Sequence, residues 1–243
     1  MRDAFAQEMT RLAAERTDLT LLSGDIGNRM FDRFKEVAPE RFFNCGIAEA
    51  NMMSLAAGMA LSGLRPVIYT ITPFTTTRCL EQIRVGVAYH QAPVVIVGTG
   101  SGLSYAELGP THHSLEDMAI LRTLPGLNVL APADSAELVA QLREALDAPH
   151  PTYMRIGKKG EPPLHDPAAS LGIGKGQMLR DGSDLLVIGV GPILGEALQE
   201  FAHVLPRVRV LAGALGHHAR ILDMPTNFKT DWADRGFPVE RSE

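Results

Sequence analysis

The sequence contains little of what marks several classes of protein. Its 243 residues include two cysteines, Cys45 and Cys79, and one tryptophan. Two cysteines at this spacing suggest neither a disulfide framework nor a metal site, which is typical of a reducing cytoplasm. No apolar run reaches the roughly 18 residues that a membrane-spanning helix needs. The amino-terminal stretch also lacks the apolar region of a signal peptide. We therefore expect a cytoplasmic protein with no membrane association.

The sequence also lacks a strong excess of charge of either sign. The chain has 23 Lys and Arg residues against 28 Asp and Glu residues, which gives a net charge of -5. Nothing here predicts the basic surface that binds nucleic acid. Hydrophobic residues make up 45% and charged residues 21% of the chain, as in an ordinary globular protein. A chain of this length can bury a substantial core.

Short apolar segments alternate with helical patterns along the chain. The segment at 93–98 (PVVIVG) is typical of a strand that is covered on both faces. The alternation predicts an α/β fold with a mostly parallel sheet and helices on both faces. Ligands of such sheets bind beyond the carboxyl ends of the strands. We therefore expect the chemistry in the loops at 23–28, 44–49, 71–75, 98–113 and 155–159.

One segment breaks this alternation. Residues 157–170 (GKKGEPPLHDPAAS) combine glycine, proline and charge, as linkers do. Beyond them, strands are expected at 185–190 and 219–223, with a helix at 194–204 between them. The sequence thus predicts a first domain at 1–157, a linker at 158–172 and a short α/β domain at 173–243.

Glu49 begins the helix that the pattern predicts at 48–62. An acid in the first turn of a helix ordinarily complements the helix dipole. This helix, however, is apolar on most sides, which predicts a buried helix and therefore a buried carboxyl group. A buried acid without a partner is costly, and a heterocyclic nitrogen could serve as that partner.

Other polar and aromatic residues stand at strand ends. Asp25 follows Gly24 and can be a turn former. Phe74 can belong to the core, and Arg155 can reach an anion or form a surface ion pair. The loop at 98–113 (GTGSGLSYAELGPTHH) is rich in glycine but lacks the Walker lysine, so it is a weak phosphate signal or a flexible connection.

Four motifs in fixed order match one family. They are RFFNCGIAEANMMSLAAGMALSG, RCLEQIRVGVAYHQAPVVIVGTGSG, GPTHHSLEDMAILRTLPGLNVLAPAD and PTYMRIGKKG. Together they closely resemble the pyrimidine-binding domain of transketolases, above all the split bacterial kind made as two subunits. The resemblance covers residues 2–157. A weaker likeness to the family's C-terminal domain continues beyond it, where the chain is shorter than its relatives.

The resemblance implies a thiamine-diphosphate site. Glu49 matches the catalytic glutamate that hydrogen-bonds the aminopyrimidine ring of the coenzyme. Phe74 matches an aromatic residue that stacks on that ring, and Ile71 stands where many relatives have a second aromatic residue. Asp25 resembles the aspartate of the strand-end loop near the coenzyme.

The resemblance also implies substrate-binding residues. His112 matches the histidine of the G-x-T-H motif, which faces the substrate channel and takes part in catalysis. Arg155 matches an arginine that binds the substrate phosphate. Two positions differ: Gly100 stands in place of a histidine and Leu108 in place of an aspartate, both of which hold polar parts of the sugar in relatives. Losing such contacts typically costs a few kcal/mol, so an altered substrate or inactivity is expected.

A second subunit is implied as well. Relatives hold the coenzyme diphosphate through Mg²⁺ or Ca²⁺ on a G-D-G motif followed by an asparagine, and a metal of this kind needs oxygen ligands. Neither Gly24-Asp25-Ile26 nor Asp181-Gly182-Ser183 supplies that motif. We therefore expect no metal ligand in this chain. The expected partner is an N-terminal transketolase subunit that carries the diphosphate site, in an α2β2 heterotetramer.

The resulting prediction is a subunit of a transketolase-like transferase. It would move a two-carbon ketol unit from a ketose-type donor to an aldehyde or a carrier-bound acceptor, and only with its partner subunit. Two alternatives stay open. The chain could be the beta subunit of a 2-oxo acid dehydrogenase, against which the motifs around 81–84 and 109–134 argue. It could also be a non-catalytic regulatory paralogue, which the differences at Gly100 and Leu108 favour and the retention of Glu49 opposes.

Overall fold

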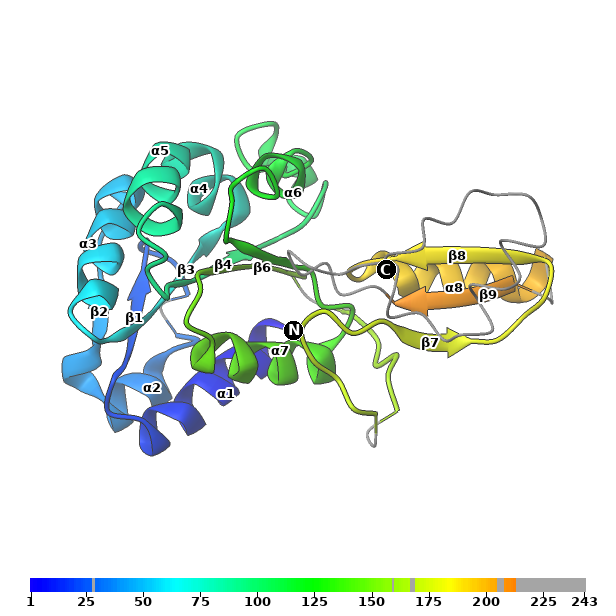
Figure 1. Cartoon of the computed structure of the whole chain (residues 1–243), viewed down its shortest axis with the longest axis horizontal. Helices are drawn as coiled ribbons and strands as arrows, with labels where there is room; N and C mark the ends of the chain where they lie inside the picture. Colours follow the sequence, from blue (N-terminus) through cyan, green and yellow to red (C-terminus); the bar gives the residue numbers. More distant parts are fainter. Residues whose placement is uncertain (28, 159, 167–168, 205–207, 213–243) are drawn as a thin grey trace, which may run out of the picture.

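A parallel sheet of six strands forms the larger part of the molecule (Figure 1). The computed structural model of the chain describes residues 1–27, 29–158, 160–166, 169–204 and 208–212. The strand order in the larger sheet is β2-β1-β3-β4-β6-β5. These strands are β1 (Leu19–Ser23), β2 (Phe42–Asn44), β3 (Arg65–Ile71), β4 (Val95–Thr99), β5 (Asn128–Leu130) and β6 (Thr152–Ile156).

Helices cover both faces of this sheet (Figure 1). The first face carries α1 (Arg2–Glu15), α2 (Asp32–Val37) and α7 (Ser135–Asp147). The second carries α3 (Glu49–Leu61), α5 (Leu80–Gln82), the π-helix η3 (Ile83–Ala88) and α6 (Asp117–Leu121). Each face has its own apolar core, and all five residues of β1 and of β4 are buried between the two. The predicted α/β fold is confirmed.

A second, smaller sheet follows the segment that is predicted to be a linker. It has the strand order β7-β9-β8, with β9 antiparallel to β7 and parallel to β8. The apolar face of α8 packs on it through Leu198 and Leu194. The elements are β7 (Gln177–Arg180), β8 (Leu185–Gly189), α8 (Ile193–Val204) and β9 (Val208–Ala212). The strand expected at 219–223 lies outside the described residues, and the domain boundaries remain a prediction.

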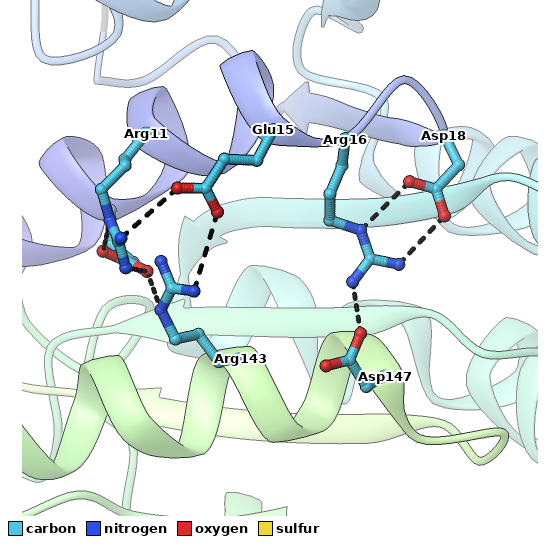
Figure 2. Close-up of polar contacts among 7 residues, drawn as sticks. Arg11, Glu15, Arg16, Asp18, Arg143 and Asp147 are labelled. Atoms are coloured by element: carbon cyan, nitrogen blue, oxygen red, sulfur yellow. Dashed lines mark hydrogen bonds and ion pairs between the residues drawn. The ribbon is translucent and has the colours of Figure 1, made fainter.

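Ion pairs fasten α1 to α7 on the side of the sheet away from α3 (Figure 2). Arg143 of α7 reaches Glu15 of α1 at 3.8 Å. Arg16, just after α1, pairs with Asp18 at 3.0 Å and also with Asp147 at the end of α7. The hydrogen bond that Arg16 donates to Asp18 raises the pKa of Arg16, although burial opposes this shift. Exposed pairs of this kind contribute little each, so the apolar core dominates the packing.

One helical segment is irregular and one local expectation was wrong. The segment over 77–88 is divided into η2 (Thr77–Cys79), α5 and η3, because a π-helical stretch replaces the regular α-helical hydrogen bonds over 83–88. The helix expected to be buried on most sides, α3, exposes one side. Leu55 is 41% and Leu61 59% exposed there, because no element in the described part of this chain covers that side. The first turn of α3 is nevertheless buried at Glu49, as predicted.

Candidate functional site

The loops that follow the strands of the larger sheet share one edge of the molecule. Because β1, β2, β3, β4 and β6 are parallel, their carboxyl ends all open toward this edge. The first turn of α3 begins there after β2. The short helix α4 (Thr72–Thr75) and η2 follow β3, and the glycine-rich loop with η4 (Ala106–Leu108) follows β4. The edge thus collects every loop in which chemistry was expected.

Glu49 is the first residue of α3, and its side chain is 3% exposed. Its Oε1 accepts a hydrogen bond of 2.8 Å from Nη1 of Arg78. Gly24, after β1, allows this close packing: a β-carbon on it would lie 3.3 Å from Cγ of Glu49 and 3.3 Å from Cβ of Thr70. The hydroxyl group of Thr70 is buried and has no hydrogen-bond partner among the described residues.

Phe74 lies on α4, which begins directly after β3 and has Pro73 in its first turn. The guanidinium carbon of Arg78 lies 3.9 Å from the centre of the Phe74 ring. The imidazole of His112 meets the same ring edge-on, with 5.1 Å between the ring centres. The structure therefore brings together Glu49, Phe74 and His112, three of the predicted site residues, with Arg78 between the first two.

Arg78 was not among the predicted site residues. A usable signal was present, because Arg78 follows Phe74 by four residues, a spacing that places two side chains on one side of a helical turn. His113 points elsewhere: its Nε2 lies 3.3 Å from the carbonyl oxygen of Ala106. The two adjacent histidines do not share one site, as expected.

The loop after β4 closes on itself over Gly100. An isolated antiparallel bridge joins Gly102 to Ser114. Gly100 has φ +86°, and a β-carbon there would lie 2.2 Å from Cε2 of Tyr105. The Tyr105 ring is buried, 6.1 Å from the ring of His112, and the ammonium group of Lys158 lies 4.1 Å from its centre. Tyr105, which was also not predicted, therefore occupies the space that a side chain at position 100 would need.

The two remaining substrate candidates differ in their surroundings. Leu108 ends η4 and is 48% exposed. Arg155 lies near the end of β6 with its side chain 18% exposed, and its Nη1 donates to Oδ1 of Asp117 at 2.9 Å. The hydroxyl group of Tyr153 donates to the other oxygen of Asp117 at 2.6 Å. Burial, together with this carboxylate, raises the pKa of Tyr153. Within the described part of the chain, Arg155 thus has its ion pair with Asp117 and not with Glu49.

Asp25 and Ile71 frame the site from β1 and β3. Asp25 has φ +56°, and its Oδ1 accepts from Nδ2 of Asn44 at 2.9 Å. Oδ1 of Asn44 in turn accepts from the backbone N–H of Gly46 at 3.0 Å. This chain of contacts holds the turn that leads into Glu49. Ile71 is buried at the end of β3, immediately before α4.

Residues 1–161 match the family model of the transketolase pyrimidine-binding domain. The chain belongs to this family. The expected family and its fold are thereby confirmed. No helix among the described residues of this transketolase-family chain is long and apolar enough to cross a bilayer.

Two relatives of this transketolase-family chain are named as transketolase subunits. The chain is 34% identical over 225 residues to an apulose-4-phosphate transketolase subunit of Phocaeicola vulgatus, a match that covers 92% of this chain and 70% of that protein. It is also 34% identical, over 194 residues, to a 6-deoxy-6-sulfo-D-fructose transketolase subunit of a Clostridium species. That match covers 80% of this chain but 58% of the relative, so part of the relative has no counterpart here.

Solved structures show the same fold. A structure described as a split gene transketolase, inactive beta4 tetramer, is 31% identical with a TM-score of 0.79, and the match covers 88% of this chain and 71% of that one. The transketolase from Leishmania mexicana is 21% identical with a TM-score of 0.78, and it shares the fold over 94% of this chain and 36% of its own.

The residues around Glu49 fit the pyrimidine half of thiamine diphosphate. They provide a buried carboxyl group for a ring nitrogen, an aromatic face on Phe74 and the hydroxyl group of Thr70, which no described residue hydrogen-bonds. For the divalent metal that is expected on the diphosphate, the described residues contain no group of three His, Cys, Asp or Glu side chains able to hold it. The donors present thus fit one half of the coenzyme.

Proposed function

We propose that the chain is the pyrimidine-binding subunit of a split transketolase. This enzyme would transfer a two-carbon ketol unit from a ketose-type donor to an aldehyde or a carrier-bound acceptor. The observation on which the proposal rests is the buried carboxyl group of Glu49, which Arg78 links to Phe74, at the carboxyl edge of the sheet. Relatives that are named as transketolase subunits support the reaction class.

Each residue of the site then has a task. When bound, thiamine diphosphate supplies the carbon nucleophile for the transfer. Glu49 would hold a proton between its carboxyl group and the ring nitrogen, in surroundings that exclude water. Phe74 would orient the ring by stacking, with Ile71 and Asp25 fixing the two neighbouring strand ends. His112, next to Phe74, would exchange protons with the substrate hydroxyl groups.

The substrate end of the site is less polar than that of a sugar-phosphate transketolase. Tyr105 covers Gly100, and Leu108 presents an apolar side chain. Arg155 would bind an anionic group, but Asp117 neutralises part of its charge. We therefore propose a donor or acceptor with fewer hydroxyl groups near the reacting carbon than an ordinary ketose phosphate has.

The proposal includes a partner subunit. It would be an N-terminal transketolase subunit that holds the diphosphate through Mg²⁺ or Ca²⁺, in a cytoplasmic α2β2 heterotetramer. The uncovered side of α3, with Leu55 and Leu61 exposed, supports a contact between subunits there. The solved relative described as an inactive beta4 tetramer supports the proposal that this subunit is inactive alone.

The test is reconstitution. The chain is combined with a candidate partner subunit, Mg²⁺ and thiamine diphosphate, and product formation is followed by mass spectrometry with a panel of ketose, deoxyketose and 2-oxo acid donors. Two-carbon transfer is expected from a ketose-type donor by the pair and by neither subunit alone. Decarboxylation of a 2-oxo acid without ketol transfer would contradict the proposal in favour of a dehydrogenase subunit. Binding of coenzyme with no turnover of any donor would favour a regulatory paralogue.

A further inference from the structure

Arg78 makes two contacts at once. Its Nη1 donates to Oε1 of Glu49 at 2.8 Å, and its guanidinium carbon lies 3.9 Å from the centre of the Phe74 ring. A guanidinium group is planar, presents N–H donors in its plane and stacks on aromatic faces. Arg78 uses both properties here, one toward the acid and one toward the ring.

These contacts are the ones that the proposed function assigns to the coenzyme. An aminopyrimidine ring is also planar, would bond the carboxyl group of Glu49 through a ring nitrogen and would stack on Phe74. We propose that Arg78 is an internal competitor of this ring, and that the coenzyme binds at full strength only after the guanidinium group has moved away. The inference rests on the proposed function of Glu49 and Phe74.

Burial explains why the competitor can be both stable and removable. The side chain of Glu49 is 3% exposed, so it needs a hydrogen-bond donor at all times. The side chain of Arg78 is 46% exposed, so its charged end can turn into water without crossing the core. The fixed group is therefore the acid, and the movable group is the cation.

The proposal can be tested through charge, because removing Arg78 has two effects of opposite sign on the affinity for the coenzyme. Thiamine diphosphate carries a negatively charged diphosphate group, so losing a nearby positive charge should weaken its binding on general electrostatic grounds. Losing a competitor should tighten it. A thiazole diphosphate fragment keeps the diphosphate charge but lacks the pyrimidine ring, so removing Arg78 should leave only the electrostatic effect and should not tighten binding of the fragment.

The experiment uses the assembled complex of the chain with its partner subunit and Mg²⁺. Binding of thiamine diphosphate and of the thiazole diphosphate fragment is measured by titration calorimetry for the unchanged chain, Arg78→Gln and Arg78→Lys. Arg33→Gln, which changes an exposed arginine on α2 away from the site, removes the same charge as a control. Circular dichroism and size-exclusion chromatography report folding and assembly.

Arg78→Gln is expected to tighten thiamine diphosphate about threefold to thirtyfold, the range for losing one half-exposed ion pair and one cation–aromatic contact. Arg78→Lys, which keeps the charge but not the planar stack, should tighten it less. The fragment should bind no variant more tightly than it binds the unchanged chain. Equal or weaker coenzyme binding by Arg78→Gln, in a complex that assembles normally, would overturn the inference. If the unchanged complex binds no coenzyme, the proposed function itself fails.

Discussion

Glu49 and Asp134 are both buried acids with a cationic partner, but they are satisfied in different ways. Asp134, before α7, accepts from the backbone N–H groups of Glu137, Leu164 and His165 at 2.9, 2.8 and 2.9 Å. The His165 ring lies 3.1 Å from it. Every one of these donors is part of the backbone or buried. The side-chain donor of Glu49 is instead carried by a half-exposed arginine, Arg78.

The difference separates a structural acid from one that is available to a ligand. Asp134 caps α7 by accepting from the backbone N–H of Glu137, and its other backbone donors, at Leu164 and His165, join residues 164–165 to the start of this helix. Because these donors are backbone groups, they cannot turn into water as a half-exposed side chain can. The donor of Glu49 can leave. A buried acid with fixed donors therefore stabilises the fold, whereas a buried acid with a movable donor can exchange that donor for a bound molecule.

The largest expected effect comes from Glu49→Gln in the assembled complex. The amide keeps the size of the side chain but cannot hold the proton, so turnover should fall at least about a hundredfold. The free energy of unfolding should change by less than about 1 kcal/mol, because a single half-exposed partner is lost. Steady-state kinetics and urea unfolding measure the two quantities. Glu36→Gln, at an exposed acid on α2, is the matched control, and normal turnover in Glu49→Gln would remove Glu49 from the mechanism.

Asp134→Asn should show the reverse behaviour. The new amide has an NH₂ group, a donor, where the carboxylate accepted from backbone N–H groups, and His165 loses its anionic partner. The free energy of unfolding should therefore fall by about 3 kcal/mol. Coenzyme affinity of the complex that remains folded should be unchanged. Urea unfolding and calorimetry test this, and a loss of affinity without a loss of stability would show that the two acids are not distinct in role.

The same cluster predicts how stability depends on pH. The hydrogen bond to Asp134 raises the pKa of His165 above 6.5, and burial raises the pKa of Glu137 above 4.5. A raised pKa means that stability is lost as pH rises through the folded value. Burial also acts to raise the pKa of Asp134, but the hydrogen bonds from His165 and the backbone lower it below 3.8, so its contribution is lost only in acid.

The free energy of unfolding should therefore decline as pH rises, and His165 should contribute to this decline above pH 6.5. Thermal unfolding between about pH 5.5 and pH 9 measures the decline. His165→Gln should lower stability at the acid end of this range and reduce the slope above pH 6.5. An unchanged slope in this variant would mean that His165 is not protonated in the folded chain.

Much of this could be predicted from the sequence, for reasons that differ by element. The β-branched run of β4 and the periodicity of α7 depend on local sequence, so the fold class followed from them. The burial of Glu49 followed from the apolar character of α3. The outward side of α3 was mispredicted. The hydrophobicity of a side chain indicates that it is stabilised by burial, but not whether the covering surface belongs to this chain or to another.

The sequence did not predict Arg78 or Tyr105 as site residues. The position of each side chain depends on a residue elsewhere in the site. Arg78 owes its place to a bond with Glu49, 29 residues away in sequence. Tyr105 owes its place to the missing side chain of Gly100. Such complementary packing depends on loop geometry, which neither periodicity nor composition encodes.

The smallest expected effect is on the far side of the sheet, where a third acid has two cations. Glu8 is buried and pairs with Arg11 at 3.1 Å and also with Arg143. Because Arg143 remains, Arg11→Ala should change the free energy of unfolding by less than about 0.5 kcal/mol. Removing both arginines leaves Glu8 buried without a cation and should cost clearly more than the two single losses together. A double-mutant cycle by urea unfolding measures this difference. Strict additivity would mean that the burial of an acid does not determine how much its cationic partners contribute to the free energy of unfolding.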